Sequence, residues 1–464
     1  MTTRSTRARR SMIALAATAT VGMLAAGLVA PASAQDKLIL DVVSLRPGDS
    51  EDAFHAFDAQ VTQFEAANPD IDIVAHEYNW TGPTFAAMLA GGTLPDVFTI
   101  PYTDGKSLIE QGQLADITDL VKALPYGDKF NPNVLATAQD DQGHIYGVPR
   151  QGYAIGLQYN RQLFEQAGLD PDAPPTTWDE VRAAAKQIAE QTGQAGYVQM
   201  SQNNTGGWQT TVATYARGGR MEQVNEDGTV TSTVNNPATK EALEFLKALR
   251  WEDDSMGSNF LLDWGSSNQA FAAGQVGMYT QGADVYTNLV QAQQIDPAIY
   301  GLTTVPLSDS PDAGVLIGGD IAAVNVKATP EEQAAAVRWI DFYYMQKLLD
   351  KDAAVLDAQT LAADGQPVGT PSMPIFDQAT LEQSREWIKD YINVPLDQMT
   401  GFTDGIYDQQ LVGEPSHHTQ EMYAILDTVV QAVLTDENAD IDALLTDAQS
   451  QVQALIDADA AAAQ

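Results

Sequence analysis

The stretch "YNRQLFEQAGLDPDAPPTTWDE", residues 159–180, contains consecutive signals that start and stop helices. Its first part predicts a short helix over residues 163–167 that ends at Gly168, because glycine readily adopts the left-handed conformation found after a helix. The prolines that follow prevent this helix from continuing. Thr177 and Glu180 then have the spacing of a capping box, which predicts the start of a second helix. Each part of the stretch is explained by the start or end of a helix, so we expect the functional residues to lie outside it.

Strands and helices alternate on the N-terminal side of this stretch. Residues 37–45 and 71–78 have the apolar patterns of strands, and an amphipathic helical stripe at 57–64 separates them. A third strand is predicted over 95–100. This alternation favours an α/β fold with a mainly parallel sheet and flanking helices. Ligands of such sheets gather at the carboxyl ends of the strands, so residues 101–104 become candidates for a site.

The C-terminal side continues the pattern. Residues 225–249 predict a turn, a strand and a helix. Residues 271–284 predict a glycine-punctuated strand that ends in an open loop, and residues 314–325 predict a strand broken at Gly318-Gly319. Beyond residue 348 the chain is predicted to be helical with irregular joints.

The N-terminus has the features of an export signal. Arginines 4, 7, 9 and 10 precede an apolar run over 12–29, and the small residues 32–34 supply a cleavage site, so we expect residues 1–34 to be a signal peptide. The paired arginines leave both the general secretory and the twin-arginine routes open. A membrane anchor is disfavoured because the run is near the lower limit for a span.

Composition narrows the class of protein. Without residues 1–34 the chain has 20 lysines and arginines against 62 acidic residues, a net charge of −42, which disfavours binding to nucleic acid or anionic membranes. The acids are scattered, so solubility, salt adaptation and attraction of cations stay open as explanations. The chain has no cysteine and therefore neither disulfides nor an N-terminal lipidated cysteine. We expect a freely soluble periplasmic or secreted protein, large enough for two lobes.

Motifs for covalent chemistry are missing. The sequence has no G-x-S-x-G, P-loop, G-x-G-x-x-G or H-E-x-x-H pattern, so we expect no catalytic residues, no cofactor and no metal. The adjacent His417 and His418 do not share a helix face, and "DDQGH" and "NEDGT" lack the full ligand spacing of a calcium loop. A glycosidase needs only two carboxylates, which 62 acids cannot discriminate, so a secreted carbohydrate-active enzyme stays as an alternative.

Aromatic residues are informative by position. One group lies in or beside predicted loops, where the rings could stack on the apolar faces of sugars: Trp80, Tyr102, Tyr153, Trp208 and Tyr286. A second group lies on predicted amphipathic helices and is expected in the core: Trp178, Trp251 and Trp339.

Taken in order, the motifs resemble those of the extracellular solute-binding proteins of ABC importers, specifically the large maltose-binding-like family (family 1) that mostly takes up carbohydrates. The matching segments are "FEAANPDIDIV", "LAGGTLPDVFTI", "LIEQGQLADITDLV", "IYGVPRQGYAIGLQYNRQLFEQAGLDPDAPPTTWDE", "YARGGR", "AFAAGQVGMYTQGAD" and "GVLIGGDIAAVN".

The resemblance implies a type II periplasmic-binding-protein fold, in which two α/β lobes are joined by a hinge and close on the ligand. Lobe one would hold residues 36–150 and 319–347, and lobe two residues 151–318 and 348–464.

The resemblance also implies a ligand site. In the crossing strand "VPRQGYAIGLQYN", residues 148–160, alternation predicts that Gln151 and Tyr153 face one way and Arg150 and Gly152 the other. Tyr153 is favoured because its position resembles one that meets ligand in the family. The remaining candidates occupy positions that meet ligand in the family or lie in the predicted loops: Trp80, Tyr102, Asp104, Trp208, Asp284, Tyr286, Asp320 and Tyr423. Many relatives have tryptophan where this chain has Asp284, which points away from a long oligosaccharide and towards a small sugar, glycoside or polyol.

The implied function is that of a monomeric receptor that captures a carbohydrate by hinge closure and delivers it to an ABC permease in the membrane. It would be no enzyme and would bind no nucleic acid. The acid-rich candidates keep a cationic or zwitterionic solute as the alternative ligand.

Overall fold

The computed structural model describes residues 37–225 and 229–462, and the predicted signal peptide at 1–34 lies outside them. The strands are β1 (Leu38–Val43), β2 (Ile71–His76), β3 (Val97–Pro101), β4 (Gly147–Asn160), β5 (Ala195–Tyr197), β6 (Glu222–Val224), β7 (Val230–Ser232), β8 (Val276–Gly282), β9 (Tyr300–Thr304), β10 (Val315–Val324) and β11 (Leu411–Gly413).

The helices that cover and connect these strands are α1 (Glu51–Ala67), α2 (Gly82–Gly91), α3 (Tyr102–Glu110), α4 (Thr118–Lys122), α5 (Pro132–Leu135), α6 (Arg161–Ala167), α7 (Trp178–Thr192), α8 (Thr205–Tyr215), α9 (Pro237–Lys247), α10 (Trp264–Ala272), α11 (Val285–Gln293), α12 (Pro330–Ile340), α13 (Gln346–Leu349), α14 (Lys351–Ala363), α15 (Gln378–Ile388), α16 (Thr400–Thr403), α17 (Thr419–Thr435) and α18 (Ile441–Ala462).

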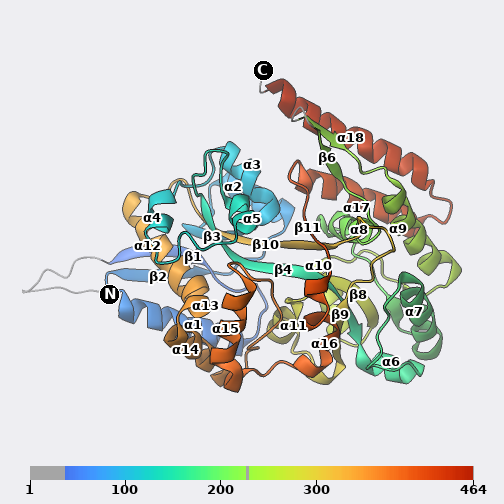
Figure 1. Ribbon diagram of the computed structural model, residues 1–464, viewed down its shortest axis with the longest axis horizontal. Helices are drawn as coiled ribbons and strands as arrows, with labels where there is room; N and C mark the ends of the chain where they lie inside the picture. Colours follow the sequence, from blue (N-terminus) through green and yellow to red (C-terminus); the bar gives the residue numbers. More distant parts are fainter. Residues whose placement is uncertain (1–36, 226–228, 463–464) are drawn as a thin grey trace, which may run out of the picture. The chain divides into compact units, whose positions relative to one another are not determined.

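The two longest strands, β4 and β10, lie in the middle of the sheet between β3 and β8. The strand order is β2-β1-β3-β10-β4-β8-β5. β1 pairs in parallel with β2 and β3, and β5 pairs in parallel with β8. β4 and β10 pair antiparallel with each other over residues 147–154 and 317–323, and the second half of β4 continues between β8 and β9. Figure 1 shows β4 and β10 side by side between β3 and β8.

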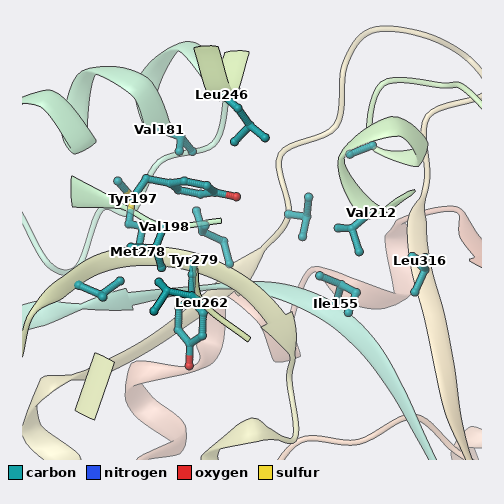
Figure 2. Close-up of a cluster of buried hydrophobic side chains, with 14 of the residues drawn as sticks. Ile155, Val181, Tyr197, Val198, Val212, Leu246, Leu262, Met278, Tyr279 and Leu316 are labelled. Carbon is teal, nitrogen blue, oxygen red and sulfur yellow. The ribbon is translucent and has the colours of Figure 1, made fainter. Parts of the chain in front are cut away.

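Separate apolar clusters lie on the two sides of this pair. One contains residues from β1, α1 and α12, including Phe57, Phe64 and Trp339, and the aromatic rings of Phe64 and Trp339 meet edge to face at 5.1 Å. Another gathers side chains from β4, α7, α8 and β8, among them Val181 and Tyr279 (Figure 2). The prediction that Trp339 belongs to the core is confirmed, since it is fully buried.

The helix signals in residues 159–180 are confirmed. α6 ends at Gly168 with a φ of 76°, the left-handed conformation that glycine tolerates. In α7 the Thr177 hydroxyl accepts from the Glu180 N–H, and the Glu180 carboxylate accepts from the Thr177 N–H. Both helix boundaries therefore follow from local chemistry alone.

Several predicted loops are helices. Tyr102 begins α3, Trp208 lies within α8, and Tyr286 lies in the first turn of α11, so the prediction of loop positions for these residues is wrong. The predicted break at Gly318-Gly319 is also wrong, because β10 continues through both glycines. Residues 264–272 form α10, so only the second half of the 271–284 segment is a strand. At Gly318-Gly319, pairing with β4 has overridden the low strand propensity of glycine.

Replacing Thr177 by alanine should lower the free energy of unfolding by about 1 kcal/mol, because the first turn of α7 loses its hydroxyl cap. Urea unfolding followed by circular dichroism measures the change. Exposed Glu190 on the same helix provides the control: Glu190→Ala should stay within about 0.5 kcal/mol of the parent. Equal stabilities for both variants would contradict the capping role.

Candidate functional site

A cavity of about 250 Å³ opens beside the β4–β10 pair and is lined by residues from distant parts of the sequence. Its walls come from the ends of strands and the starts of helices: Arg46, Asn79, Trp80, Thr81, Pro101, Tyr153, Asn203, Asn204, Thr205, Trp208, Asp263, Trp264, Gly265, Gln281, Gly282, Asp284, Val285, Asp320, Glu414, Gln420 and Tyr423. The predicted lobes both contribute, the first through residues 46–101 and Asp320 and the second through the rest.

Aromatic rings form a large part of the wall. Tyr153 of β4 and Trp208 of α8 meet edge to face with centroids 6.3 Å apart at 83°. Trp264 begins α10, and the guanidinium of Arg46 lies 4.2 Å above its ring. Trp80 completes the set of half-buried rings in the wall. Such rings offer flat apolar faces with polar edges, which suits the alternating apolar and hydroxyl surfaces of a small polar solute.

A β-bulge brings two neighbouring residues of β4 to the carboxylates of the cavity. Gln151 lies opposite Asp320 in the pairing of β4 with β10, and the register shifts immediately after Asp320. Arg150 is left as the extra residue of β4. Its Nη2 donates to Asp320 Oδ2 at 2.8 Å, while the Gln151 amide donates to Asp284 Oδ2. The alternation predicted for this strand is wrong here, since the bulge lets both side chains reach cavity carboxylates.

Glycines make the close approach of the two strands possible. A Cβ atom on Gly319 would lie 2.1 Å from the carbonyl oxygen of Gln151. A Cβ atom on Gly318 would lie 2.6 Å from both Glu414 Oε2 and Tyr153 Oη. Any larger residue would displace a backbone or a cavity side chain, so the glycine pair is required by packing at the site.

Several carboxylates around the cavity are largely shielded from solvent, which raises their pKa values. Burial, together with the nearby charge of Asp320, raises the pKa of Asp284 to about 6. Burial raises the pKa of Glu414 to about 8. It also raises the pKa of Asp104 to about 7, although the indole of Trp80 donates to this carboxylate at 3.2 Å. The cavity is therefore less negative at neutral pH than its acidic residues suggest.

A buried carboxylate on α17 fixes the start of α8. Asp427 Oδ2 accepts from the Asn204 N–H at 2.8 Å, and Oδ1 accepts from the Gly207 N–H at 2.9 Å. Asn203 and Asn204 adopt the left-handed conformation, with φ of 57° and 70°. Because Trp208 lies one helical turn beyond Asn204, these hydrogen bonds help to fix the position of Trp208 in the cavity wall.

The structure brings six of the predicted site residues to the cavity wall: Trp80, Tyr153, Trp208, Asp284, Asp320 and Tyr423. The other five lie behind it. Arg150 and Gln151 hold cavity carboxylates, the Tyr102 hydroxyl donates to the Gln151 carbonyl at 2.9 Å, and Asp104 accepts from Trp80. Tyr286 is buried in the core, with its ring 4.9 Å from that of Tyr300.

Several residues of the cavity wall are absent from the sequence prediction, and three of them carry chemistry that matters for the site: Arg46, Trp264 and Glu414. Arg46 follows β1 at the carboxyl end of a strand, so the rule that selected residues 101–104 after β3 would have found it. Trp264 follows Asp263, whose carboxylate caps α10, a signal readable in the sequence. Glu414 follows a three-residue strand, and no local pattern marks it.

Neither a membrane-spanning helix nor a metal-binding cluster is found in residues 37–225 and 229–462. Within these ranges no helix has both the length and the apolar character needed to cross a membrane. The same ranges contain no group of three or more histidine and acidic side chains arranged to hold a metal ion.

Comparisons with known proteins agree with this architecture. The family model for bacterial extracellular solute-binding proteins matches residues 48–346. A lactose-binding protein of Rhizobium radiobacter is 25% identical over 308 residues, which are 64% of this chain and 68% of that protein. The sn-glycerol-3-phosphate-binding periplasmic protein of Escherichia coli is 24% identical over 306 residues, 61% of this chain and 66% of that protein. The match thus spans about two thirds of these relatives.

Solved structures confirm the fold class. A solute-binding protein of an ABC transporter from Thermotoga lettingae, bound with α-D-tagatose, superimposes with a TM-score of 0.72 at 18% identity, covering 90% of this chain and all of that one. The expected α/β fold of the type II periplasmic-binding-protein class is therefore observed.

Replacing Asp427 by alanine should lower the free energy of unfolding by about 2 to 3 kcal/mol, because two buried N–H groups at the start of α8 lose their acceptor. Urea unfolding measures this free energy. Asp427→Asn keeps one acceptor oxygen, so its free energy of unfolding should lie between those of Asp427→Ala and the parent. Thr329→Ala removes a helix cap far from the cavity and should cost about 1 kcal/mol. A smaller loss for Asp427→Ala than for Thr329→Ala would contradict the assigned role.

Proposed function

Because the chain belongs to the bacterial extracellular solute-binding protein family, we propose that it captures a small carbohydrate in this cavity and delivers it to the permease of an ABC transporter. The observation that carries the proposal is the combination of an aromatic wall with buried, hydrogen-bonding carboxylates. Carboxylates accept strong hydrogen bonds from paired hydroxyl groups, and rings cover the apolar face of a sugar. No residue of the site needs to form a covalent bond.

The size of the cavity supports a small ligand. Ligand pockets commonly occupy roughly 300 to 1,000 Å³, and this cavity of about 250 Å³ lies just below that range. The resemblance to the family implies a tryptophan where this chain has Asp284, so this part of the wall has one stacking surface fewer. A monosaccharide, short oligosaccharide, glycoside or polyol fits better than a long chain.

Contacts between the predicted lobes support closure around the ligand. Gln420 Nε2 donates to Thr103 Oγ1 at 2.6 Å, and the Arg46 guanidinium lies over Trp264. Both contacts join residues that the prediction assigned to different lobes, and both would separate as a hinge opens. The division into residues 36–150 with 319–347 and 151–318 with 348–464 remains our proposal.

One segment near the end of the chain leads us to propose an amendment to that division, which assigns all of residues 348–464 to lobe two. α14 contacts α1 through hydrogen bonds from Gln60 to Asp357 at 2.5 Å and from Gln63 to Thr360 at 3.0 Å. Residues 375–376 also belong to the apolar cluster of α1 and α12. These contacts indicate that part of the segment after residue 348 moves with lobe one during closure.

A cationic or zwitterionic solute is the second candidate. The carboxylates of Asp284 and Asp320 together with the aromatic wall could bind an ammonium group, and Arg46 could bind an anionic group of the same molecule. The pairing of Asp320 with Arg150 and the raised pKa of Asp284 and Glu414 reduce the negative charge available, which favours the uncharged ligand.

The family is extracellular, which agrees with the expected export from the cytoplasm. We propose that residues 1–34 are the cleaved export signal and that the mature protein acts as a monomer.

Isothermal titration calorimetry of the mature protein against neutral sugars, polyols, sugar phosphates and quaternary amines tests the proposed function. We expect a neutral carbohydrate to bind with a dissociation constant near 1 µM, which corresponds to about 8 kcal/mol and permits later release. Binding of amines without sugars would support the second candidate. Hydrolysis of a glycoside during the titration would show that the protein is an enzyme and would contradict the proposed receptor function.

Trp208→Ala should weaken binding of that carbohydrate about tenfold, equivalent to ~1.4 kcal/mol, because a stacking surface is lost from the wall. Trp387 is also half-buried but does not line the cavity, so Trp387→Ala provides the matched control and should bind as tightly as the parent. Unchanged affinity in the Trp208 variant would refute its assignment as a stacking residue.

A further inference from the structure

Glu414 reaches the ligand cavity only through the tertiary fold. It follows β11, which pairs in parallel with the start of β10 so that Gly413 lies opposite Ile317. The next position therefore lies beside Gly318, and a Cβ atom on that glycine would be 2.6 Å from Glu414 Oε2. This register places the carboxyl group of Glu414 in the cavity wall.

The two oxygens of this carboxyl group have different surroundings. Oε1 accepts a hydrogen bond of 2.9 Å from the Tyr423 hydroxyl. Oε2 is buried and has no hydrogen-bond partner within the described part of the chain. A buried polar atom without a partner is costly, and in a ligand cavity the missing partner is supplied by the ligand.

The surroundings of Glu414 favour its uncharged form. Burial and, to a lesser extent, the negative charges of Asp320 on β10 and Asp104 on α3 raise its pKa to about 8, although the Tyr423 hydrogen bond acts in the opposite direction. Tyr153 on β4 also faces the group and is itself held neutral by burial, which raises its pKa. At neutral pH the free oxygen therefore carries a proton and is a donor.

We propose that Glu414 binds the ligand through Oε2 as a hydrogen-bond donor to an uncharged acceptor oxygen, such as a hydroxyl or ring oxygen of a carbohydrate. This inference rests on the proposed function and adds to it a preference for ligands that present a hydrogen-bond acceptor to Glu414. The charged groups of the wall accept hydrogen bonds from the ligand, whereas Glu414 donates one. A solute that presents only donors towards Glu414, such as a primary ammonium group, is disfavoured.

Calorimetric titrations of the carbohydrate between pH 6.5 and pH 9.5 test this role. For the parent protein we expect affinity to fall about tenfold from pH 7 to pH 9, because above pH 8 the proton must be restored before the ligand binds. Glu414→Gln has an amide donor that does not titrate in this range, so its affinity should stay nearly constant. Glu414→Ala should bind about tenfold more weakly than the parent at pH 7.

Glu190→Gln is the control variant, since Glu190 is exposed on α7 and does not line the cavity. It should reproduce the pH profile of the parent. Thermal unfolding provides a check on folding: the raised pKa means that ionisation of Glu414 opposes folding above about pH 4.5, so Glu414→Gln should be at least as stable as the parent at pH 7.

Identical pH profiles for the parent and Glu414→Gln, or full affinity in Glu414→Ala, would overturn the assignment while leaving the receptor function intact. If the parent binds no carbohydrate at any pH, the proposed function itself fails, and this inference fails with it.

Discussion

The antiparallel pairing of β4 with β10 is the constraint on which the rest of the structure depends. The two strands can lie this close because Gly318 and Gly319 carry no side chain where the partner strand and the cavity residues approach. Their register also contains the bulge at Arg150, which directs consecutive residues towards cavity carboxylates. One strand pair therefore contributes residues to each of three apolar clusters and also positions the polar part of the site.

The electrostatics of the cavity follow from the same arrangement. Buried carboxylates close to one another are tolerated only when each has a partner or remains protonated. Arg150 pairs with Asp320 and Gln151 donates to Asp284, whereas burial raises the pKa of Glu414 to about 8, which favours its protonated form at pH 7. The result is a site rich in both acceptors and donors with little net charge of its own. This explains how a chain with 62 acidic residues can present a cavity suited to uncharged ligands.

The sequence predicted features that depend on neighbours along the chain and missed those that depend on distant contacts. The capping box at Thr177 and the left-handed Gly168 are local, and both are observed. Tyr286 was placed in a loop, but α11 begins one residue earlier and carries the ring into the core. Glu414 could not be found, because only the pairing of β11 with β10 brings it to the cavity. Tyr153, Asp284 and Asp320 could be predicted because their positions resemble those that meet ligand in the family.

The central claim is that a small carbohydrate binds between the aromatic wall and the carboxylates beside the β4–β10 pair. A crystal structure of the mature protein with the tightest-binding sugar from the calorimetric panel tests this claim most directly. The account predicts that the sugar contacts Asp320 and Trp80 on one side and Trp208, Asp284 and Glu414 on the other, with Glu414 Oε2 within hydrogen-bonding distance of a sugar oxygen. A sugar bound elsewhere, such as the surface groove beside Arg217 and Arg220, would contradict it.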